Sequence, residues 1–175
     1  LAYSQGYHPQ PRINLAAALP LGFTSESEIA DIWLEADLPI HQIQAALQEA
    51  LPPGISLIQV EEVDPQTPAL QTQIQSAEYI ATLLDYPNNN IDQRIQEILA
   101  AQSLPRERRE KQYDLRPLIL ELERVENDDQ GHCCLRMRLL AQAGATGRPE
   151  EVLAALDIPV ESTRVHRTRL FFVDP

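Results

Sequence analysis

The chain has 175 residues, 43% of them hydrophobic and 23% charged, which provides enough apolar material for a folded core and excludes an intrinsically disordered protein. Its formal net charge of -12 argues against a surface that binds nucleic acid throughout, because phosphate contacts need a basic field. The longest apolar run, residues 13–23, falls short of the roughly 20 residues that span a bilayer and is interrupted by polar residues and proline, so no membrane segment is expected.

The N-terminus and the cysteines bear on cellular location. The sequence begins with Leu1 rather than Met and shows no secretory signal, so a fragment of a longer polypeptide is one interpretation, and we expect a cytoplasmic protein. Cys133 and Cys134 are adjacent, and neighbouring residues of a strand point to opposite faces, which makes joint chelation of one metal difficult. We therefore expect two reduced cysteines, one of them in the core, and no metal site in this chain.

Residues 3–12 form the most distinctive segment, YSQGYHPQPR. Gly6 can adopt a positive φ, whereas Pro9 and Pro11 each fix their own φ and restrict the residue before them. A stiff, extended turn is therefore expected here. It would either present its aromatic, imidazole and guanidinium side chains to a ligand or simply turn a corner.

Three side chains of that turn are candidates for ligand binding: Tyr7, His8 and Arg12. His8 could act as an acid or a base, since the ordinary pKa of histidine is about 6.5, and Arg12 could clamp a carboxylate or a phosphate. No nucleophile or orienting acid accompanies His8 in the sequence, so no catalytic residue is assigned. The alternative is that His8 is a loop imidazole bonded to the backbone.

The first part of the chain is predicted to be ββαβ. Residues 13–19 and 29–36 are strand-like and are joined by a turn-rich stretch. Residues 39–51 carry apolar side chains at helical spacing, after a proline suited to the first helical turn. Residues 55–63 follow as another strand, and residues 64–76, rich in proline and glutamine, are interpreted as a linker.

The second part is predicted to be βαββαβ. Its six segments cover residues 78–84, 91–99, 108–126, 133–141, 149–156 and 163–173. The turn before the first helix is placed at residues 87–90. The third segment is interpreted as one strand that bends at residues 114–117.

These patterns predict an α+β protein made of two ferredoxin-like halves, each a split βαβ unit with an antiparallel sheet. The N-terminal half covers residues 1–63 and lacks the opening strand and helix of that unit, whereas the C-terminal half covers residues 77–175. Because the opening strand lies in the middle of such a sheet, its absence leaves a gap. Residues upstream of Leu1, a partner chain or a different sheet order are the candidates for filling it.

One hairpin register can be predicted from side-chain pairing between residues 118–126 and 132–141. It places apolar pairs on one face and opposite charges on the other: Leu122 with Met137, Leu120 with Leu139, Glu123 with Arg136, and Glu121 with Arg138. Arg136 and Arg138 are therefore expected to be structural partners of carboxylates rather than phosphate ligands.

The last strand carries the densest group of basic residues. Its alternation predicts two faces, one with Arg164, His166 and Thr168 and the other with Val165, Arg167 and Arg169. The open face of such a sheet is a common platform for single-stranded RNA, which makes Arg164, His166 and Arg167 candidate contacts. The stacking aromatic residues expected on such a platform are sparse, however.

Arginine is strongly favoured over lysine, with 13 arginines and a single lysine. This bias suits bidentate contacts to anions, but a genome of high GC content would produce it without any functional reason. Arg148 lies just before the helix predicted over residues 149–156, where it could reach an anion or simply belong to the helix cap. An anion site shared by His8, Arg12 and Arg148 is therefore one hypothesis to test.

Six segments of the chain resemble the bacterial radical-SAM-linked domain of unknown function: YSQGYHPQPRI, ALPLGFTSESEIADI, ALPPGI, YDLRPLI, GRPEEVL and HRTRLFF. Family members usually carry Phe where this chain has Tyr7. The resemblance implies a strand and a helix before Leu1, and association with a cobalamin-binding radical SAM protein. The iron-sulfur cluster, S-adenosylmethionine and cobalamin would belong to that enzyme, and no cofactor is expected in this chain.

The leading expectation is a non-catalytic accessory domain that docks on a radical SAM enzyme or presents a substrate to it, with tRNA or another RNA as one candidate. The first alternative is a small enzyme in which His8 serves as the acid-base group and Arg12 as the anion clamp. The second is a structural module that self-associates through unpaired strand edges.

Overall fold

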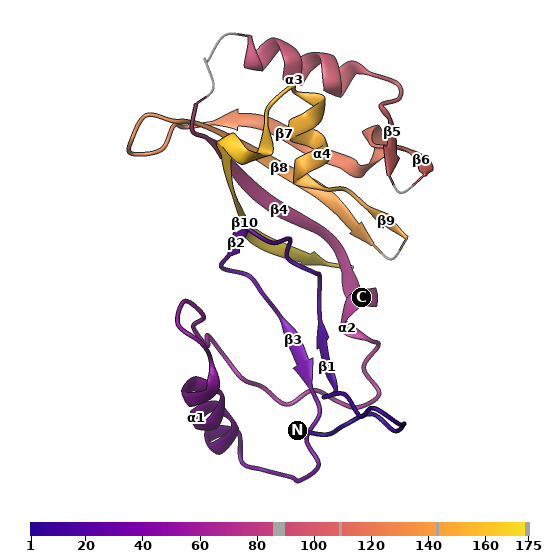
Figure 1. Cartoon of the computed structure of the whole chain (residues 1–175), viewed down its shortest axis with the longest axis vertical. Helices are drawn as coiled ribbons and strands as arrows, with labels where there is room; N and C mark the ends of the chain where they lie inside the picture. The colour runs from indigo at the N-terminus through magenta and orange to yellow at the C-terminus, as the bar shows by residue number, and fades with distance from the viewer. Residues whose placement is uncertain (86–89, 109, 143, 174–175) are drawn as a thin grey trace. The chain divides into compact units, whose positions relative to one another are not determined.

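The structure of the protein is a computed structural model that describes residues 1–85, 90–108, 110–142 and 144–173. It divides into two compact units (Figure 1). Unit 1 comprises Leu1–Asn14 and Asp31–Ala69, and unit 2 comprises Leu15–Ala30 and Leu70–Pro175. The division therefore differs from a single boundary after residue 63, because the segment Leu15–Ala30 packs with the C-terminal part of the chain.

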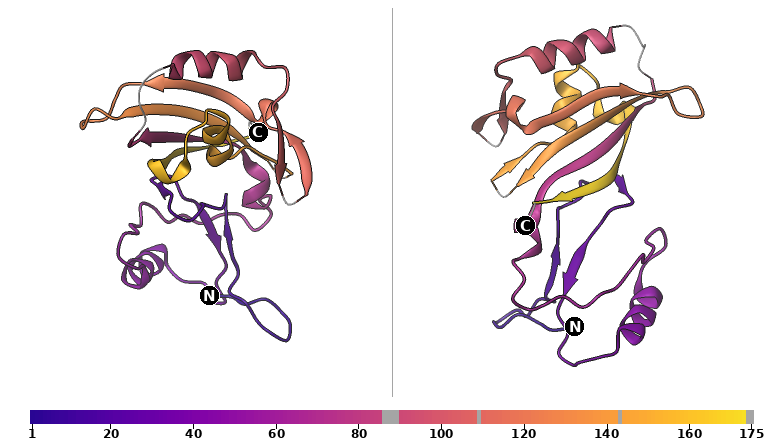
Figure 2. Two further views of the ribbon diagram at one scale, coloured as in Figure 1. Left: turned by 45° about the horizontal axis from the view of Figure 1, so that its top comes forward. Right: turned by 180° about the vertical axis from the view of Figure 1, so that it is seen from behind.

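Unit 2 is built on a mixed sheet with the strand order β2-β10-β4-β8-β7 (Figure 2). Its strands are β2 (Thr24–Ser25), β4 (Ile74–Leu83), β7 (Ile119–Val125), β8 (Cys133–Gln142) and β10 (Thr163–Phe172). The pairs β10–β4, β4–β8 and β8–β7 are antiparallel, whereas β2 runs parallel to β10. A short strand, β9 (Ala145–Thr146), pairs with the end of β8.

One face of this sheet forms the hydrophobic core. Alternate strand residues point into it, as the two-residue period of a strand requires: Ala77, Tyr79, Ala81 and Leu83 from β4, and Leu135, Met137 and Leu139 from β8. The helices α3 (Ile91–Ala100) and α4 (Pro149–Ala155) contribute their apolar side chains to the same core. Both helices are confirmed at their predicted positions, whereas most of the turn predicted at residues 87–90 lies outside the described residues.

The predicted β7–β8 register is confirmed for three of its four pairs. Glu121 faces Arg138, Leu122 faces Met137 and Glu123 faces Arg136. The fourth pair is wrong, because a bulge between Ile119 and Glu121 sets Ile119 rather than Leu120 opposite Leu139. Ile119 is buried as a result, and Leu120 is 43% exposed.

The bent strand predicted over residues 108–126 is also wrong. The chain first forms a separate hairpin from β5 (Pro105–Arg108) and β6 (Lys111–Asp114), then the 3-10 turn η1 (Arg116–Leu118), and only then enters β7. The Asp114 carboxylate causes this break, since it accepts hydrogen bonds from the backbone N–H groups of Leu104 and Arg116. A side chain that satisfies backbone donors in this way favours a turn over a continued strand.

Unit 1 contains far less regular structure. The short strands β1 (Ile13–Leu15) and β3 (Ala30–Ile32), each of which has residues in both units, pair with each other, and the predicted helix is confirmed as α1 (Ile40–Ala50). The strand predicted over residues 55–63 is wrong, since this segment forms no regular element and Ile58 within it is 78% exposed. A strand needs a neighbour to receive its backbone hydrogen bonds, and none pairs with this segment.

The linker predicted over residues 64–76 contains regular structure in its second half. Its last residues form α2 (Leu70–Gln73) and the start of β4, and the apolar side chains of Leu70 and Ile74 hold them in the core of unit 2. Of the predicted N-terminal ββαβ unit, the first two strands are present in shortened form as β1 and β3 and the helix as α1, but the last strand is missing. Residues 24–25, which were expected in a turn, form β2 and join β10. Within the described residues the protein is α+β, with antiparallel and mixed sheets and four α-helices, none of which has the length and apolar character needed to cross a membrane.

Candidate functional site

The predicted stiff turn near the N-terminus is a closed hairpin. Tyr3 forms an antiparallel bridge with Pro11, and Ser4 and Gln10 are joined twice, from the Ser4 N–H to the Gln10 carbonyl (2.8 Å) and from the Gln10 N–H to the Ser4 hydroxyl (2.9 Å). Gly6 adopts a φ of +146° near the tip, a conformation that other residues rarely tolerate. The tip is therefore held in place from both sides.

This hairpin presents two adjoining rings to solvent. The side chain of Tyr7 is 96% exposed, and its ring meets the His8 ring edge-on, with 5.1 Å between centroids. Among the residues that the structure describes, His8 makes no hydrogen bond to an acid or to a nucleophile. The hairpin tip therefore has the geometry of an aromatic contact point.

Arg12 lies at the base of the hairpin and is turned toward Trp33. Its guanidinium stacks over the indole ring at 4.8 Å, and its backbone bridges Ala2 and Trp33 through hydrogen bonds in both directions. A cation–π contact leaves the outer N–H groups of an arginine free to bind an anion. Because His8 and Arg12 belong to unit 1 and Arg148 to unit 2, an anion site shared by the three stays a prediction.

Arg148 occupies the cap position before α4, in extended backbone conformation. Its carbonyl accepts hydrogen bonds from the N–H groups of Glu151 and Val152, but its side chain makes no capping bond. Burial raises the pKa of the nearby Tyr113 hydroxyl, the Glu151 carboxylate raises it further, and the Arg148 charge partly offsets the two. Arg148 therefore lies near the Glu151 carboxylate and the Tyr113 hydroxyl, and is not an isolated charge.

Arg167 departs most clearly from its prediction as a surface contact, because it is only 1% exposed. Its guanidinium donates to the carbonyls of Ala17 (3.1 Å) and Ala18 (2.8 Å) and forms a 2.8 Å ion pair with Glu28. It also lies over the ring of Tyr79, at 5.5 Å from the centroid. Arg167 thus fastens residues 17–28 to the sheet and is not available to a ligand in solution.

The face on which each residue of β10 lies also needs correction. Val165 and Arg167 share one face as predicted, and this face is the buried one, but a bulge between Arg167 and Arg169 interrupts the alternation. Arg169 is consequently exposed, and Leu170 takes the next buried position. Tyr79 lies next to Arg167 on this buried face. Desolvation raises the pKa of the Tyr79 hydroxyl, although the charge of Arg167 opposes this shift.

The opposite face of the sheet carries the remaining polar side chains of β10. His166 bonds to the Thr24 hydroxyl at 2.8 Å and lies 3.9 Å from the Glu26 carboxylate, so β2 engages it. Arg164 is exposed on the same face. His166 is therefore in part a structural residue, and Arg164 keeps its exposure.

The arginines of β8 are confirmed as partners of carboxylates. Arg136 forms an ion pair with Glu123 and approaches Glu78, and Arg138 lies 3.5 Å from Glu121. Arg138 also donates to the Ser76 hydroxyl at 2.9 Å and stacks over the Phe171 ring at 3.9 Å. The open face of the sheet is thus largely charge-compensated, which reduces the positive field that RNA phosphates would need.

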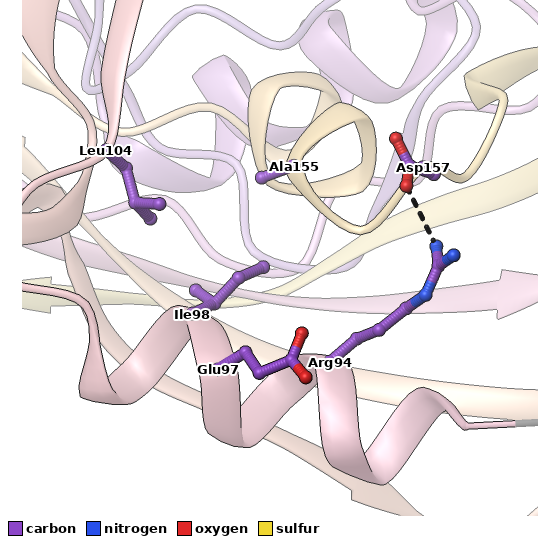
Figure 3. A pocket seen from close by; sticks show the side chains of 6 residues that line it. All are labelled: Arg94, Glu97, Ile98, Leu104, Ala155 and Asp157. Carbon is purple, nitrogen blue, oxygen red and sulfur yellow. Dashed lines mark ion pairs between the residues drawn. The ribbon is translucent and has the colours of Figure 1, made fainter.

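Figure 3 shows a shallow pocket of about 280 Å³ between α3 and α4 that sequence reasoning missed. Arg94 reaches across it from α3 to Asp157 at 3.2 Å and also donates to the Leu156 carbonyl. The other lining residues are Glu97, Ile98, Leu104 and Ala155. Because Arg94 is already engaged at the end of α4, it ties the two helices together instead of facing a vacant site.

A second pocket, of about 290 Å³, lies at the start of β10. Its apolar lining comes from Leu21, Phe23, Val160 and Val165. Among the described residues no group of three or more His, Cys, Asp or Glu side chains could hold a metal ion. Both cysteines are free and buried, and burial raises the pKa of the Cys133 thiol.

Unit 1 contains no buried residue, although every one of its residues is described. Large apolar side chains are instead exposed along its whole length: Leu1, Tyr3, Tyr7, Ile13, Leu38, Ile40, Ile55, Ile58 and Val63. Apolar surface of this extent is uncommon on a free protein and marks interaction sites. Sequence reasoning missed this exposed apolar surface. The apolar residues at 55–63 were part of its signal, but they were interpreted as a strand.

The chain matches the model of a known family over most of its length. A bacterial family described as "Uncharacterized protein conserved in bacteria (DUF2344)" matches residues 1–149. No curated protein matches the chain.

Proposed function

This chain belongs to that bacterial family of uncharacterized proteins, and we propose that it is a non-catalytic accessory domain that docks on a radical SAM enzyme in the cytoplasm. One observation carries the proposal: unit 1 exposes many large apolar side chains and buries none. Such a unit gains stability when a second protein covers it, because burying apolar surface is the main favourable term in association. The kind of partner comes from the family resemblance of the sequence.

The hairpin tip is the part of unit 1 best suited to anchor such a complex. Tyrosine is enriched among the residues that dominate binding energy, since it adds a large contact area and loses little conformational entropy. Tyr7 is almost fully exposed at the tip of a hairpin that two hydrogen bonds and a bridge hold closed. In this proposal the cluster, S-adenosylmethionine and cobalamin belong to the enzyme, and His8 performs no chemistry.

A protein partner is favoured over RNA by the charges. Arg136, Arg138 and Arg167 are committed to carboxylates or carbonyls. Unit 1 contributes only one arginine and no lysine, so it offers phosphates no basic field. Arg164 and Arg169 are exposed and could make a limited contact with RNA. The binding experiment below tests for such a contact.

We also infer that the segments β4-α3-β7-β8-α4-β10 form a ferredoxin-like split βαβ unit. The order β10-β4-β8-β7 supports this, because the opening strand β4 lies inside the sheet, next to the last strand, and all three contacts are antiparallel. The β5–β6 hairpin is then an insertion between α3 and β7. Both helices pack on one face, which leaves the charged face open.

The proposal is tested by titrating the purified chain against the reconstituted radical SAM enzyme at low salt and following the complex by interferometry. Saturable binding that excess tRNA does not displace is expected. The Tyr7→Ala variant should bind about tenfold more weakly, whereas Leu120→Ser, which changes an exposed apolar residue of unit 2, should bind like the wild type. Absence of binding by the wild type would overturn the proposal, and displacement by tRNA would favour an RNA-presenting role.

A further inference from the structure

The helix α1 carries an apolar stripe that is covered only in part: Ile40 is exposed, and Ile43, Leu47 and Leu51 are half-buried. Ile40, Ile43, Leu47 and Leu51 recur at the spacing that places side chains on one helix face. None of the residues of α1 is buried, and Ile40 is 42% exposed. Each residue of the stripe therefore keeps part of its side chain exposed, and none is enclosed in a core.

The helix is also poorly stabilised from within. It has 11 residues, no side-chain cap at its N-terminus, no acidic residue in its first turn and no basic residue in its last turn. Isolated helices of this length are marginal in water, and most helices in proteins depend on packing of an apolar face. A partner that covers the stripe would supply the packing that the unit does not.

The charge around the stripe restricts what that partner can be. Unit 1 holds one basic residue, Arg12, against seven acids, Asp31, Glu35, Asp37, Glu49, Glu61, Glu62 and Asp64, so its net charge is 1 − 7 = -6. None of these acids forms an ion pair with any residue that the structure describes. The negative charge of the unit is thus left for a partner to neutralise.

A second copy of this chain is disfavoured as that partner, because two surfaces of the same sign repel each other. A nucleic acid is disfavoured for the same reason. A basic protein segment is favoured, since its charges complement the acids and its apolar side chains can lie on the stripe. Glu35 and Asp37 shortly precede α1, so acids lie next to the N-terminal end of the stripe in the sequence, whereas Glu49 lies on the opposite face of the helix.

We propose that the α1 stripe is the docking site for a basic amphipathic helix of a partner protein. This inference rests on the proposed function and specifies the surface and the partner chemistry that serve it. The segment would place its apolar face on Ile43 and Leu47 and its lysines or arginines toward carboxylates of the unit, among them Glu35 and Asp37.

The test uses the whole chain and a fluorescein-labelled probe peptide of leucine and lysine at helical spacing, LKKLLKLLKKLLKL. Fluorescence anisotropy should report saturable binding that weakens as salt is raised. The same peptide with glutamate in place of lysine should not bind. Leu47→Ser should weaken binding of the basic peptide about tenfold, whereas Gln42→Ser, an exposed polar position on the opposite face of the same helix, should leave it unchanged.

Three results would overturn the inference. The basic peptide could fail to bind, or it could bind Leu47→Ser and Gln42→Ser equally well. Alternatively, sedimentation could show a wild-type dimer that Leu47→Ser dissolves, which would identify a second copy as the occupant. Far-ultraviolet circular dichroism should confirm that both variants keep the fold of unit 2, to which Leu47 does not belong.

Binding measurements with the radical SAM enzyme distinguish a failure of this inference from a failure of the proposed function on which it rests. If the enzyme binds the wild type and Leu47→Ser with equal affinity, the accessory function stands and the α1 site is wrong. If the enzyme fails to bind the wild type, the accessory function is wrong, and the peptide titration alone then decides whether the stripe binds basic helices.

Discussion

The two units of this protein differ in how they treat their apolar side chains: unit 2 buries them and unit 1 exposes them. Unit 2 buries a continuous apolar core between a sheet face and two helices, and even encloses an arginine within it. Unit 1 is shorter, more acidic for its size, and has no buried residue. The difference indicates that unit 2 supplies most of the stability of the chain. Mutations of the same chemistry should therefore have very different consequences in the two units.

The strongest comparison is the same substitution in both units. Leu153→Ala removes a fully buried side chain of α4, and should lower the free energy of unfolding by about 3 to 4 kcal/mol. Leu47→Ala in α1 should change it by less than about 0.5 kcal/mol, since Leu47 is not buried and alanine favours helix. Urea unfolding followed by circular dichroism measures both, and equal losses would contradict the contrast between the units.

Arg167 tests whether the core of unit 2 depends on its buried charge. Arg167→Ala leaves Glu28 and the carbonyls of Ala17 and Ala18 without their donor, and should cost about 3 kcal/mol. This value is at the low end for a buried pair because the Glu28 side chain is 36% exposed and water screens it. Arg164→Ala on the same strand is the control and should cost less than about 0.5 kcal/mol. A cost below 1 kcal/mol for Arg167→Ala, measured by the same unfolding experiment, would mean that water replaces the guanidinium.

Gly147 tests how tightly unit 2 is packed. A β-carbon at this position would lie 2.9 Å from the Leu118 carbonyl oxygen and 3.1 Å from the β-carbon of Leu139. Gly147→Ala should therefore destabilise the protein by about 2 kcal/mol through overpacking. The neighbouring exposed substitution Thr146→Ala should cost much less, and an unchanged melting temperature for Gly147→Ala would show that β9 shifts freely.

The smallest expected effect concerns pH. Hydrogen bonds from the backbone N–H groups of Leu104 and Arg116 lower the pKa of Asp114, so folding stabilises its charged form. This contribution is complete above the ordinary pKa of an aspartate, and is lost as the pH falls through the lowered pKa of the folded protein. The urea midpoint of the wild type should therefore approach that of Asp114→Asn below about pH 4. A gap between the two that persists in strong acid would argue against this origin.

The elements that depend on local patterns could be predicted from the sequence. The helices α1, α3 and α4 follow their apolar spacing, and the β7–β8 register follows from facing charges and apolar residues. The error at Leu120 arose because Ile119 and Leu120 are both apolar, so the pattern cannot reveal a bulge between them. The site was predictable only in part: the exposed hairpin at residues 3–12 was expected, but whether His8, Arg12 and Arg148 share an anion remains a prediction.

Features that depend on distant pairing could not be predicted. Thr24 and His166 are 142 positions apart, and no local pattern indicates that β2 joins β10. The burial of Arg167 follows from that pairing, because residues 17–28 cover it and provide its acceptors. An arginine in a strand of alternating polarity is otherwise expected on the surface. Without a known neighbour for β10, the sequence alone could not place Arg167 inside.

The path of the chain between the units has a practical consequence. The backbone passes from unit 1 into unit 2 at residue 15, returns at residue 31, and leaves again at residue 70. A protease that cuts within the exposed segment 52–69 would therefore produce two fragments, one of which still carries residues 15–30. The β2–β10 pairing and the Arg167 contacts should keep these fragments together without a peptide bond. Fragments ending and starting in this segment, expressed as separate polypeptides, are thus expected to reassemble, so the protein would serve as a natural fragment-complementation pair.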